Sequence, residues 1–312
     1  MPEAPATTSS YKVGILFALF AAAGFSFKAI LAKLIYRYGV DAETLLGLRM
    51  ALALPCYLAL GIFARRDART RVPLSARDWL WLAGLGFCGY YLSSYLDFLG
   101  LKHISSGLER LILFLYPTLV IMISAFFLKK PLTRWTLFAL TLTYLGIALA
   151  VGHDLGNNAE ARHEIWLGAT LVFASALTYA FYLIGNGMVV QRIGALQLTV
   201  WASTFACLFS IAQFLILRPV ELALHHVWQT WALLGVMVIV STVAPVWMLS
   251  EAIRRIGAGP VSLTSTLGPV VTIALGWVIL DEPFGWNQVV GATLVIGGVW
   301  IMSRQKVREG RT

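Results

Sequence analysis

The sequence predicts an all-α membrane protein with ten transmembrane helices, arranged as two inverted five-helix repeats with both chain termini in the cytoplasm. Three observations lead to this fold class. Of the 312 residues, 59% are hydrophobic and 12% are charged, whereas soluble domains are about 25% charged. Uncharged runs long enough to cross a bilayer, which takes about 20 apolar residues, recur along the chain. The second half of the chain also repeats the glycine and proline spacing of the first half.

The uncharged runs must be helical. Lipid offers no partners to backbone groups, and the runs are too long and too uniformly apolar for the strands of a barrel. The connections between them are short and leave no room for a soluble domain. The predicted spans cover residues 12–36, 42–63, 79–100, 105–127, 133–152, 164–187, 195–217, 228–251, 257–280 and 284–303.

Positive charge sets the predicted orientation. With both termini on one side of the membrane, the segments on that side hold 16 Lys and Arg residues and those on the other side hold 4. The positive-inside rule then places the termini in the cytoplasm of a multi-pass protein of the cell inner (plasma) membrane. Residues 1–11 and 304–312 become cytoplasmic tails. The net charge of +9 is interpreted as a rim that faces lipid headgroups, so no nucleic-acid partner is expected.

An internal repeat divides the chain into residues 12–152 and 164–303. Each copy holds five predicted spans, and because five is odd the two copies must insert in opposite directions. The charge before one repeated proline inverts accordingly, from Lys129-Lys130 to Asp281-Glu282. At an offset of 152 residues the matching pairs are Gly107 and Gly259, Pro117 and Pro269, Pro131 and Pro283, and Gly146 and Gly298.

These motifs resemble those of the drug/metabolite transporter superfamily, in its ten-span form with two EamA-type repeats. The resemblance covers about residues 12–303. It implies a secondary transporter that exports amino acids or related carboxylate-bearing solutes by alternating access, with the solute held near the repeat interface. The residues that carry it are Gly24 to Lys28, Leu48-Arg49, the Gly-x9-Pro-x13-Pro pattern and Asp281-Glu282-Pro283.

Ionisable residues inside the predicted spans are the strongest indication of a site. A charge in hydrocarbon costs about 2.5–3.5 kcal/mol on insertion scales, so such residues pair or line an aqueous cavity. All six lie in the outer half of the first repeat. They are Lys28, Lys33, Arg49, Asp97, Glu109 and Arg110.

Two interpretations of this charge cluster stay open. A cavity with four cations and two anions would favour a carboxylate-bearing or zwitterionic solute, and Asp97 or Glu109 could carry a coupling proton. Alternatively the charges neutralise one another, Lys28 with Asp97 and Arg49 with Glu109, while Lys33 extends outward to the interface.

Polar and small residues add further candidates. Span nine carries a polar stripe at helical spacing that includes Ser262, Thr266 and Pro269, and it indicates either a cavity wall or helix packing. Pro117 and Pro269 each free a backbone carbonyl and are predicted hinges. Small-residue faces around Gly146 and Gly298 indicate helix packing or a possible homodimer contact.

Mid-span aromatic residues line a solute pocket or pack in the core. The predicted substrate-binding set combines them with the charges and the polar stripe: Lys28, Tyr91, Ser94, Tyr95, Asp97, Glu109, Arg110, Trp247, Ser262 and Thr266.

An intramembrane enzyme is disfavoured by the sequence. The five histidines fall in predicted loops or at span ends, and no HExxH or Gly-x-Ser-x-Gly motif occurs. No cofactor or metal is expected, and the three cysteines form no CxxC pair. The alternatives to a transporter of small solutes are a channel or a lipid-handling membrane protein.

Overall fold

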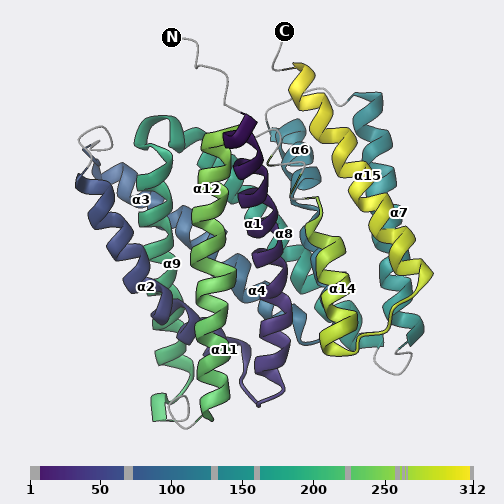
Figure 1. Ribbon diagram of the computed structural model, residues 1–312, viewed down its shortest axis with the longest axis horizontal. Coiled ribbons are helices and arrows are strands. Elements are labelled where there is room, and N and C mark those ends of the chain that lie inside the picture. The colour runs from purple at the N-terminus through teal and green to yellow at the C-terminus, as the bar shows by residue number, and fades with distance from the viewer. Residues whose placement is uncertain are drawn as a thin grey trace.

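Helices and short connections make up the structure, which is a computed structural model. Within the ranges that it describes no strand occurs. Figure 1 shows the helices side by side in one bundle, with the start of the first helix and the end of the last helix at the same end of the molecule. The described residues are 8–66, 73–127, 133–157, 162–221, 226–256, 261, 264 and 266–309.

The first half of the chain matches the first five predicted spans, with interruptions in the third and fourth. A tight turn at Gly39, whose φ of 77° suits a residue without a side chain, joins the first two helices. The elements are α1 (Thr8–Tyr36), α2 (Ala42–Arg66), α3 (Ala76–Leu85), the π-helical turn η2 (Gly86–Leu92), α4 (Ser93–Leu101), α5 (Ser106–Leu113), α6 (Tyr116–Phe127) and α7 (Arg134–Asn157).

The second half follows the same plan. Its third span is again interrupted by a π-helical turn. In its fourth span, predicted over 257–280, the described helix begins at Gly268. The elements are α8 (Arg162–Ile193), α9 (Ala195–Leu217), α11 (Trp228–Val238), η4 (Ile239–Val243), α12 (Ala244–Ile256), α14 (Gly268–Leu280) and α15 (Trp286–Glu309).

Seven helical stretches in the described part of the chain are long and apolar enough to cross a membrane. Two shorter apolar helices, Gly268–Leu280 and Trp286–Met302, fall within the ninth and tenth predicted spans. The run from α3 through η2 to α4 occupies the third. Every predicted span therefore contains a helix, while the number of crossings remains a prediction.

The two halves of the molecule interleave. The helix of the first span in each half packs on the helix that completes the third span of the other half, so α1 lies on α12 and α8 lies on α4. Second helices pack together as α2 and α9, and fifth helices as α7 and α15. Equivalent helices thus make equivalent contacts, as expected for two copies of one unit related by pseudo-twofold symmetry.

Glycines allow the fifth helices to approach closely. A β-carbon on Gly146 of α7 would stand 2.5 Å from the carbonyl oxygen of Gly291 on α15, and one on Gly291 would stand 2.6 Å from the oxygen of Gly146. Lipid tails are as apolar as leucine, so helices in a membrane associate by such close packing. The small-residue faces predicted from the sequence therefore contact each other within one chain.

The third span of each half contains a π-helical turn, and the two turns occupy matching positions in the repeat. Moving η4 back by the repeat offset places it within η2. A π turn adds a residue to the helical ladder and is often found at functional sites. The side chain of Thr242 on η4 donates to the carbonyl of Met237, five residues earlier, over 3.3 Å.

The predicted hinge prolines lie at helix beginnings. The fourth span breaks after α5, and α6 begins again at Tyr116, one residue before Pro117. Pro269 occupies the first turn of α14, where proline is compatible with helix geometry. The prediction of a continuous helix over 257–280 was wrong at this point, because Thr266 and Leu267 form a turn. Ser262 and Ser265 lie outside the described residues.

Candidate functional site

Two buried carboxylates share one ammonium group in the interior of the bundle. Nζ of Lys28 on α1 lies 2.5 Å from Oδ2 of Asp97 on α4. The same nitrogen lies 3.6 Å from Oε1 of Glu109 on α5. Asp97 is 1% exposed and Glu109 is 0% exposed. The predicted pairing of Lys28 with Asp97 is confirmed, and three helices meet at this charge.

The shared ammonium leaves both carboxylates incompletely satisfied. Oδ1 of Asp97 and both side-chain oxygens of Glu109 are buried without a hydrogen-bond partner. A buried charge without full compensation costs several kcal/mol, and such groups in native proteins usually have a functional reason. Neither side-chain oxygen of Glu109 has a hydrogen bond, although Oε1 lies 3.6 Å from the ammonium of Lys28. Glu109 can accept hydrogen bonds from an ammonium group of a solute or take up a proton.

Arg110 directs its guanidinium to the beginning of α14. A β-carbon on Gly268 would stand 3.0 Å from Nη2 of Arg110, and Nε of Arg110 has no hydrogen-bond partner. The carbonyl of Gly268 accepts a hydrogen bond from Ser26 of α1 over 3.0 Å. Arg110 therefore packs where the helix of the opposite half starts, on the same α5 as Glu109.

Arg49 forms the far side of the charge cluster. Its Nε donates to Oγ1 of Thr242 over 3.1 Å, and its guanidinium lies over the ring of Phe98, 5.4 Å from the centroid. Lys28 approaches the same ring at 5.7 Å. The predicted pairing of Arg49 with Glu109 was wrong, because the π-helical turn η4 supplies the partner of Arg49 from the other half of the chain.

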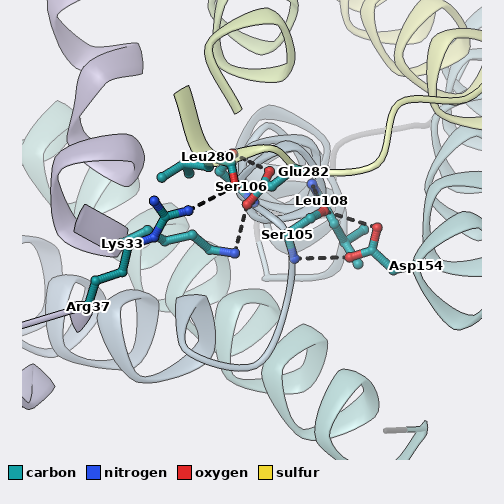
Figure 2. Close-up of polar contacts among 8 residues, drawn as sticks. All are labelled: Lys33, Arg37, Ser105, Ser106, Leu108, Asp154, Leu280 and Glu282. Carbon is teal, nitrogen blue, oxygen red and sulfur yellow. Dashed lines mark hydrogen bonds and ion pairs between the residues drawn. The ribbon is translucent and has the colours of Figure 1, made fainter. Parts of the chain in front are cut away.

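A second ionic cluster, drawn in Figure 2, lies near the ends of α1 and α14, and Figure 1 shows both helices ending away from the chain termini. Nζ of Lys33 lies 2.7 Å from Oε1 of Glu282. Nη2 of Arg37 donates to the carbonyl of Leu280 over 2.9 Å. The sequence interpretation had Lys33 extending outward without a partner, and the structure supplies one in Glu282, two residues after the end of α14.

The beginning of α5 is held by carboxylates from both halves of the chain. Glu282 accepts hydrogen bonds from the backbone nitrogen of Ser106, at 2.9 and 3.0 Å, and from its hydroxyl at 2.6 Å. Asp154 accepts from the backbone nitrogen and the hydroxyl of Ser105, each over 3.0 Å (Figure 2). Anions at a helix N-terminus satisfy its free N–H groups and its dipole.

The aromatic candidates contact residues outside the charge cluster, Tyr91 and Tyr95 against the core and Trp247 on an exposed face. Tyr91 stacks on Tyr95 with ring centroids 6.4 Å apart and also contacts Phe209 of α9. The hydroxyl of Tyr95 donates to Glu43 over 3.3 Å. Trp247 is 58% exposed and packs edge-on against Phe17. These contacts direct the rings toward α2, α9 and the outer face of α12.

The remaining predicted residues are polar or partly buried. Ser94 is partly buried on α4, three residues before Asp97. Thr266 is also partly buried and precedes Gly268, against which Arg110 packs. Of the predicted set, the structure brings together Lys28, Asp97, Glu109 and Arg110.

Several residues of the two clusters were not singled out as site residues from the sequence. Thr242, Phe98 and Gly268 have no charge that would mark them in an apolar run. Glu282 was assigned to an outer loop as part of the Asp-Glu-Pro motif. The one available signal was the unpaired Lys33, which needed an anion within reach. No group of three or more His, Cys, Asp or Glu side chains able to hold a metal occurs in the described part of the chain.

Interleaved halves, interrupted helices and buried ion pairs together are typical of a membrane transport protein. A comparison with protein-family models identifies the family. The model of the EamA-like transporter family matches residues 12–152 and again residues 166–304. The chain therefore belongs to this family, within the drug/metabolite transporter superfamily, and contains two EamA repeats.

Similar proteins are described as transporters. The chain is 30% identical to "Uncharacterized transporter YcbK" of Bacillus subtilis (strain 168), over 96% of this chain and 95% of that protein. It is 24% identical to a "Probable amino-acid metabolite efflux pump" of Salmonella typhimurium, covering 75% and 78% of the two chains. A solved crystal structure shares the fold, with a TM-score of 0.61 at 18% identity over 95% of this chain and 97% of the other.

Proposed function

We propose that this membrane transporter exports amino acids or related carboxylate-bearing solutes across the cell inner membrane by alternating access. The observation that carries the proposal is the ammonium of Lys28, shared by Asp97 and Glu109 with acceptor oxygens left over. Arg110 of the same α5 adds a guanidinium beside the start of α14. A zwitterionic solute offers a carboxylate for Arg110 and an ammonium group for Glu109.

The charge balance supports a solute with a carboxylate. Three cations, Lys28, Arg49 and Arg110, stand with two carboxylates in the interior, while Lys33 is paired with Glu282 outside this set. The surplus positive charge attracts an anionic group in a medium where electrostatic interactions are stronger than in water. Relatives described as amino-acid metabolite efflux pumps favour the same class of solute.

The proposed topology has ten crossings with both termini in the cytoplasm. The distribution of Lys and Arg along the sequence supports this orientation. The cluster around Glu282 then faces the outside. The repeats at 12–152 and 164–303 rock against each other, with flexing at the helix interruptions next to Pro117 and Pro269. Glu109, whose oxygens have no hydrogen-bond partner, is the proposed carrier of a coupling proton.

Counterflow in liposomes tests the proposal. The purified protein is reconstituted with an unlabelled amino acid inside, and entry of the labelled compound is followed for a panel of amino acids and related carboxylates. Saturable, transient accumulation of one class of solute is expected. Arg110→Ala is expected to weaken the accumulation, whereas Arg192→Gln, which removes the ion pair of the exposed Arg192 with Asp78, serves as the control.

Each alternative predicts a different result. A channel gives entry that rises linearly with solute concentration and shows no accumulation. A lipid-handling protein moves labelled phospholipid between leaflets and leaves all the soluble compounds behind. Either result overturns the proposed function. A growth screen of overexpressing cells against toxic amino-acid analogues identifies the solute.

A further inference from the structure

Glu282 connects the two halves of the chain at one end of the molecule. It lies two residues after the end of α14, and its backbone nitrogen donates to the carbonyl of Gly276 over 3.1 Å, which folds the chain back against that helix. Asp281 takes a left-handed conformation with φ of 57° to make this return possible. The side chain of Glu282 is thereby aimed at α1 and α5 rather than away from the bundle.

The carboxylate of Glu282 contacts Lys33 and Ser106, both in the other half of the chain. Its carboxylate binds Lys33 of α1 through one oxygen, at 2.7 Å, and receives three hydrogen bonds from Ser106 at the beginning of α5 (Figure 2). A β-carbon on Gly276 would stand 2.5 Å from the hydroxyl of Ser106 and 2.6 Å from Oε2 of Glu282. Gly276 thus leaves just enough space for this contact between α14 and α5.

The internal repeat offers a comparison for this cluster. At the repeat offset, Lys33 corresponds to Gly185, Ser106 to Ala258 and Glu282 to Lys130. The acid, the base and the hydroxyl are therefore all absent from the sequence at the equivalent positions. The two halves are similar, but the residues that make this ionic connection occur at only one of the two positions that the repeat relates.

We propose that Glu282 is the latch of the gate at the end away from the chain termini, and that it also positions the solute site. This inference rests on the proposed alternating access. When the gate opens, Glu282 releases Lys33 and Ser106, so α14 separates from α1 and α5. Closure restores the ion pair and the hydrogen bonds at the beginning of α5.

The latch acts on the site through α5. Ser106 lies three residues before Glu109 and four before Arg110, so all three belong to the first turns of one short helix, Ser106–Leu113. Release of Ser106 by Glu282 leaves Asp154 on Ser105 as the remaining carboxylate at this helix start. The turn that carries Glu109 then loses one of its two anchors. Glu282 is thus a positioning residue, which acts on the solute through α5.

Cysteine labelling tests the latch without any solute. Ile273 of α14 is buried against α5, since a β-carbon on Gly107 would stand 3.0 Å from it. Ile273→Cys is introduced with Cys56→Ser and Cys88→Ser, which leaves the buried Cys207 as an internal control. Intact cells are treated with a membrane-impermeant maleimide, and mass spectrometry of the two cysteine peptides gives both labelling rates.

Latch substitutions are expected to affect the introduced cysteine and spare Cys207. With Glu282→Ala, the thiol introduced on α14 should react several-fold faster than in the parent protein. Glu282→Gln should be intermediate, because the amide still accepts hydrogen bonds from Ser106. Lys33→Met breaks the ion pair and leaves α5 untouched, so it gives a smaller increase in the same direction. Arg192→Gln, which removes the ion pair of the exposed Arg192 with Asp78 between α8 and α3, should leave both rates unchanged.

The outcomes separate the latch from the transport proposal. Unchanged labelling of the introduced cysteine in Glu282→Ala and Lys33→Met overturns the latch. An equal rise in the labelling rate of Cys207 would report general loosening of the protein and would also overturn the latch. The same holds if labelling rises only in inside-out membrane vesicles, because the opening would then be on the cytoplasmic side. A selective increase in cells supports the latch even when counterflow fails for every solute tested, and that combination counts against the proposed solutes alone. Because Glu282 positions α5, which carries Glu109 and Arg110, the Glu282→Gln substitution should raise the KM of counterflow more than it lowers the maximal rate.

Discussion

Nζ of Lys28 and Oδ2 of Asp97 lie 2.5 Å apart and join α1 to α4 inside the bundle. Glu109 approaches the same nitrogen at 3.6 Å, so the cation is shared by two acids that come from consecutive elements of the chain. Removing one partner of a buried ion pair leaves an uncompensated charge and costs about 3–5 kcal/mol, whereas removing both partners can be nearly neutral. The shared cation makes the two single substitutions unequal.

Lys28→Met is therefore expected to destabilise the protein more than Asp97→Asn. The first substitution leaves two carboxylates without a cation, while the second leaves Lys28 paired with Glu109. In the double variant the coupling should recover about 3 kcal/mol of the summed losses. Unfolding of the four proteins in mixed detergent micelles, as a double-mutant cycle, measures this coupling. Additive losses would show that the two side chains do not interact.

Glu109→Gln should separate solute exchange from proton movement. The amide keeps the shape of the side chain and its acceptor oxygen but cannot bind and release a proton in the physiological range. We expect counterflow to continue in this variant, while solute accumulation driven by a pH gradient falls to the rate measured in liposomes without protein. Both measurements use the same proteoliposomes. Loss of both activities, or of neither, contradicts the assignment of the coupling proton to Glu109.

The sequence predicted those helix ends that charges or glycines mark. The seventh predicted span, 195–217, coincides with α9, which lies between Gly194 and Arg218. The turns η2 and η4 could not be predicted, because an apolar run has the same sequence character whether its backbone hydrogen bonds follow the α or the π pattern. In the fourth and ninth spans the prolines did indicate an irregularity. They mark where a helix restarts, because proline fits the first turn.

For the site, the sequence identified the charges but not all their partners. Lys28, Asp97, Glu109 and Arg110 stand out because each is costly in an apolar run. Pairing was harder, since Lys33 and Glu282 are separated by 249 residues. Arg49 likewise finds Thr242 across the interface between the halves. Such contacts depend on how the repeats interleave, and no local pattern in either segment specifies that arrangement.

Gly268→Ala should weaken solute binding through Arg110. The added β-carbon would stand 3.0 Å from Nη2 of Arg110, so the guanidinium must shift by a few tenths of an ångström. We expect a higher KM in counterflow with little change in the amount of folded protein. Gly235→Ala on α11 is the matched control, because its β-carbon meets no atom within 4 Å. An unchanged KM in Gly268→Ala would argue that Arg110 is not a solute contact.

Two adjacent glycines of α15 should respond differently to the same substitution. A β-carbon on Gly298 would stand 2.7 Å from the carbonyl oxygen of Ala139 and would collide with the hydroxyl of Thr143, both on α7. One on Gly297 would make an ordinary contact, 3.5 Å from Leu142. The collision cannot be relieved by a flexible side chain alone, because a backbone oxygen is involved, so α7 and α15 must move apart.

Gly298→Ala is accordingly expected to lower the free energy of unfolding by about 1–3 kcal/mol, the usual cost of overpacking a close contact. Gly297→Ala should be neutral or slightly stabilising, since alanine has the higher helix propensity. Thermal unfolding in detergent, followed by size-exclusion chromatography of the heated samples, compares the two variants. Equal stability would mean that the glycine faces of α7 and α15 are not in contact. A shift of Gly298→Ala alone to a smaller oligomer would instead place that face between two copies of the chain.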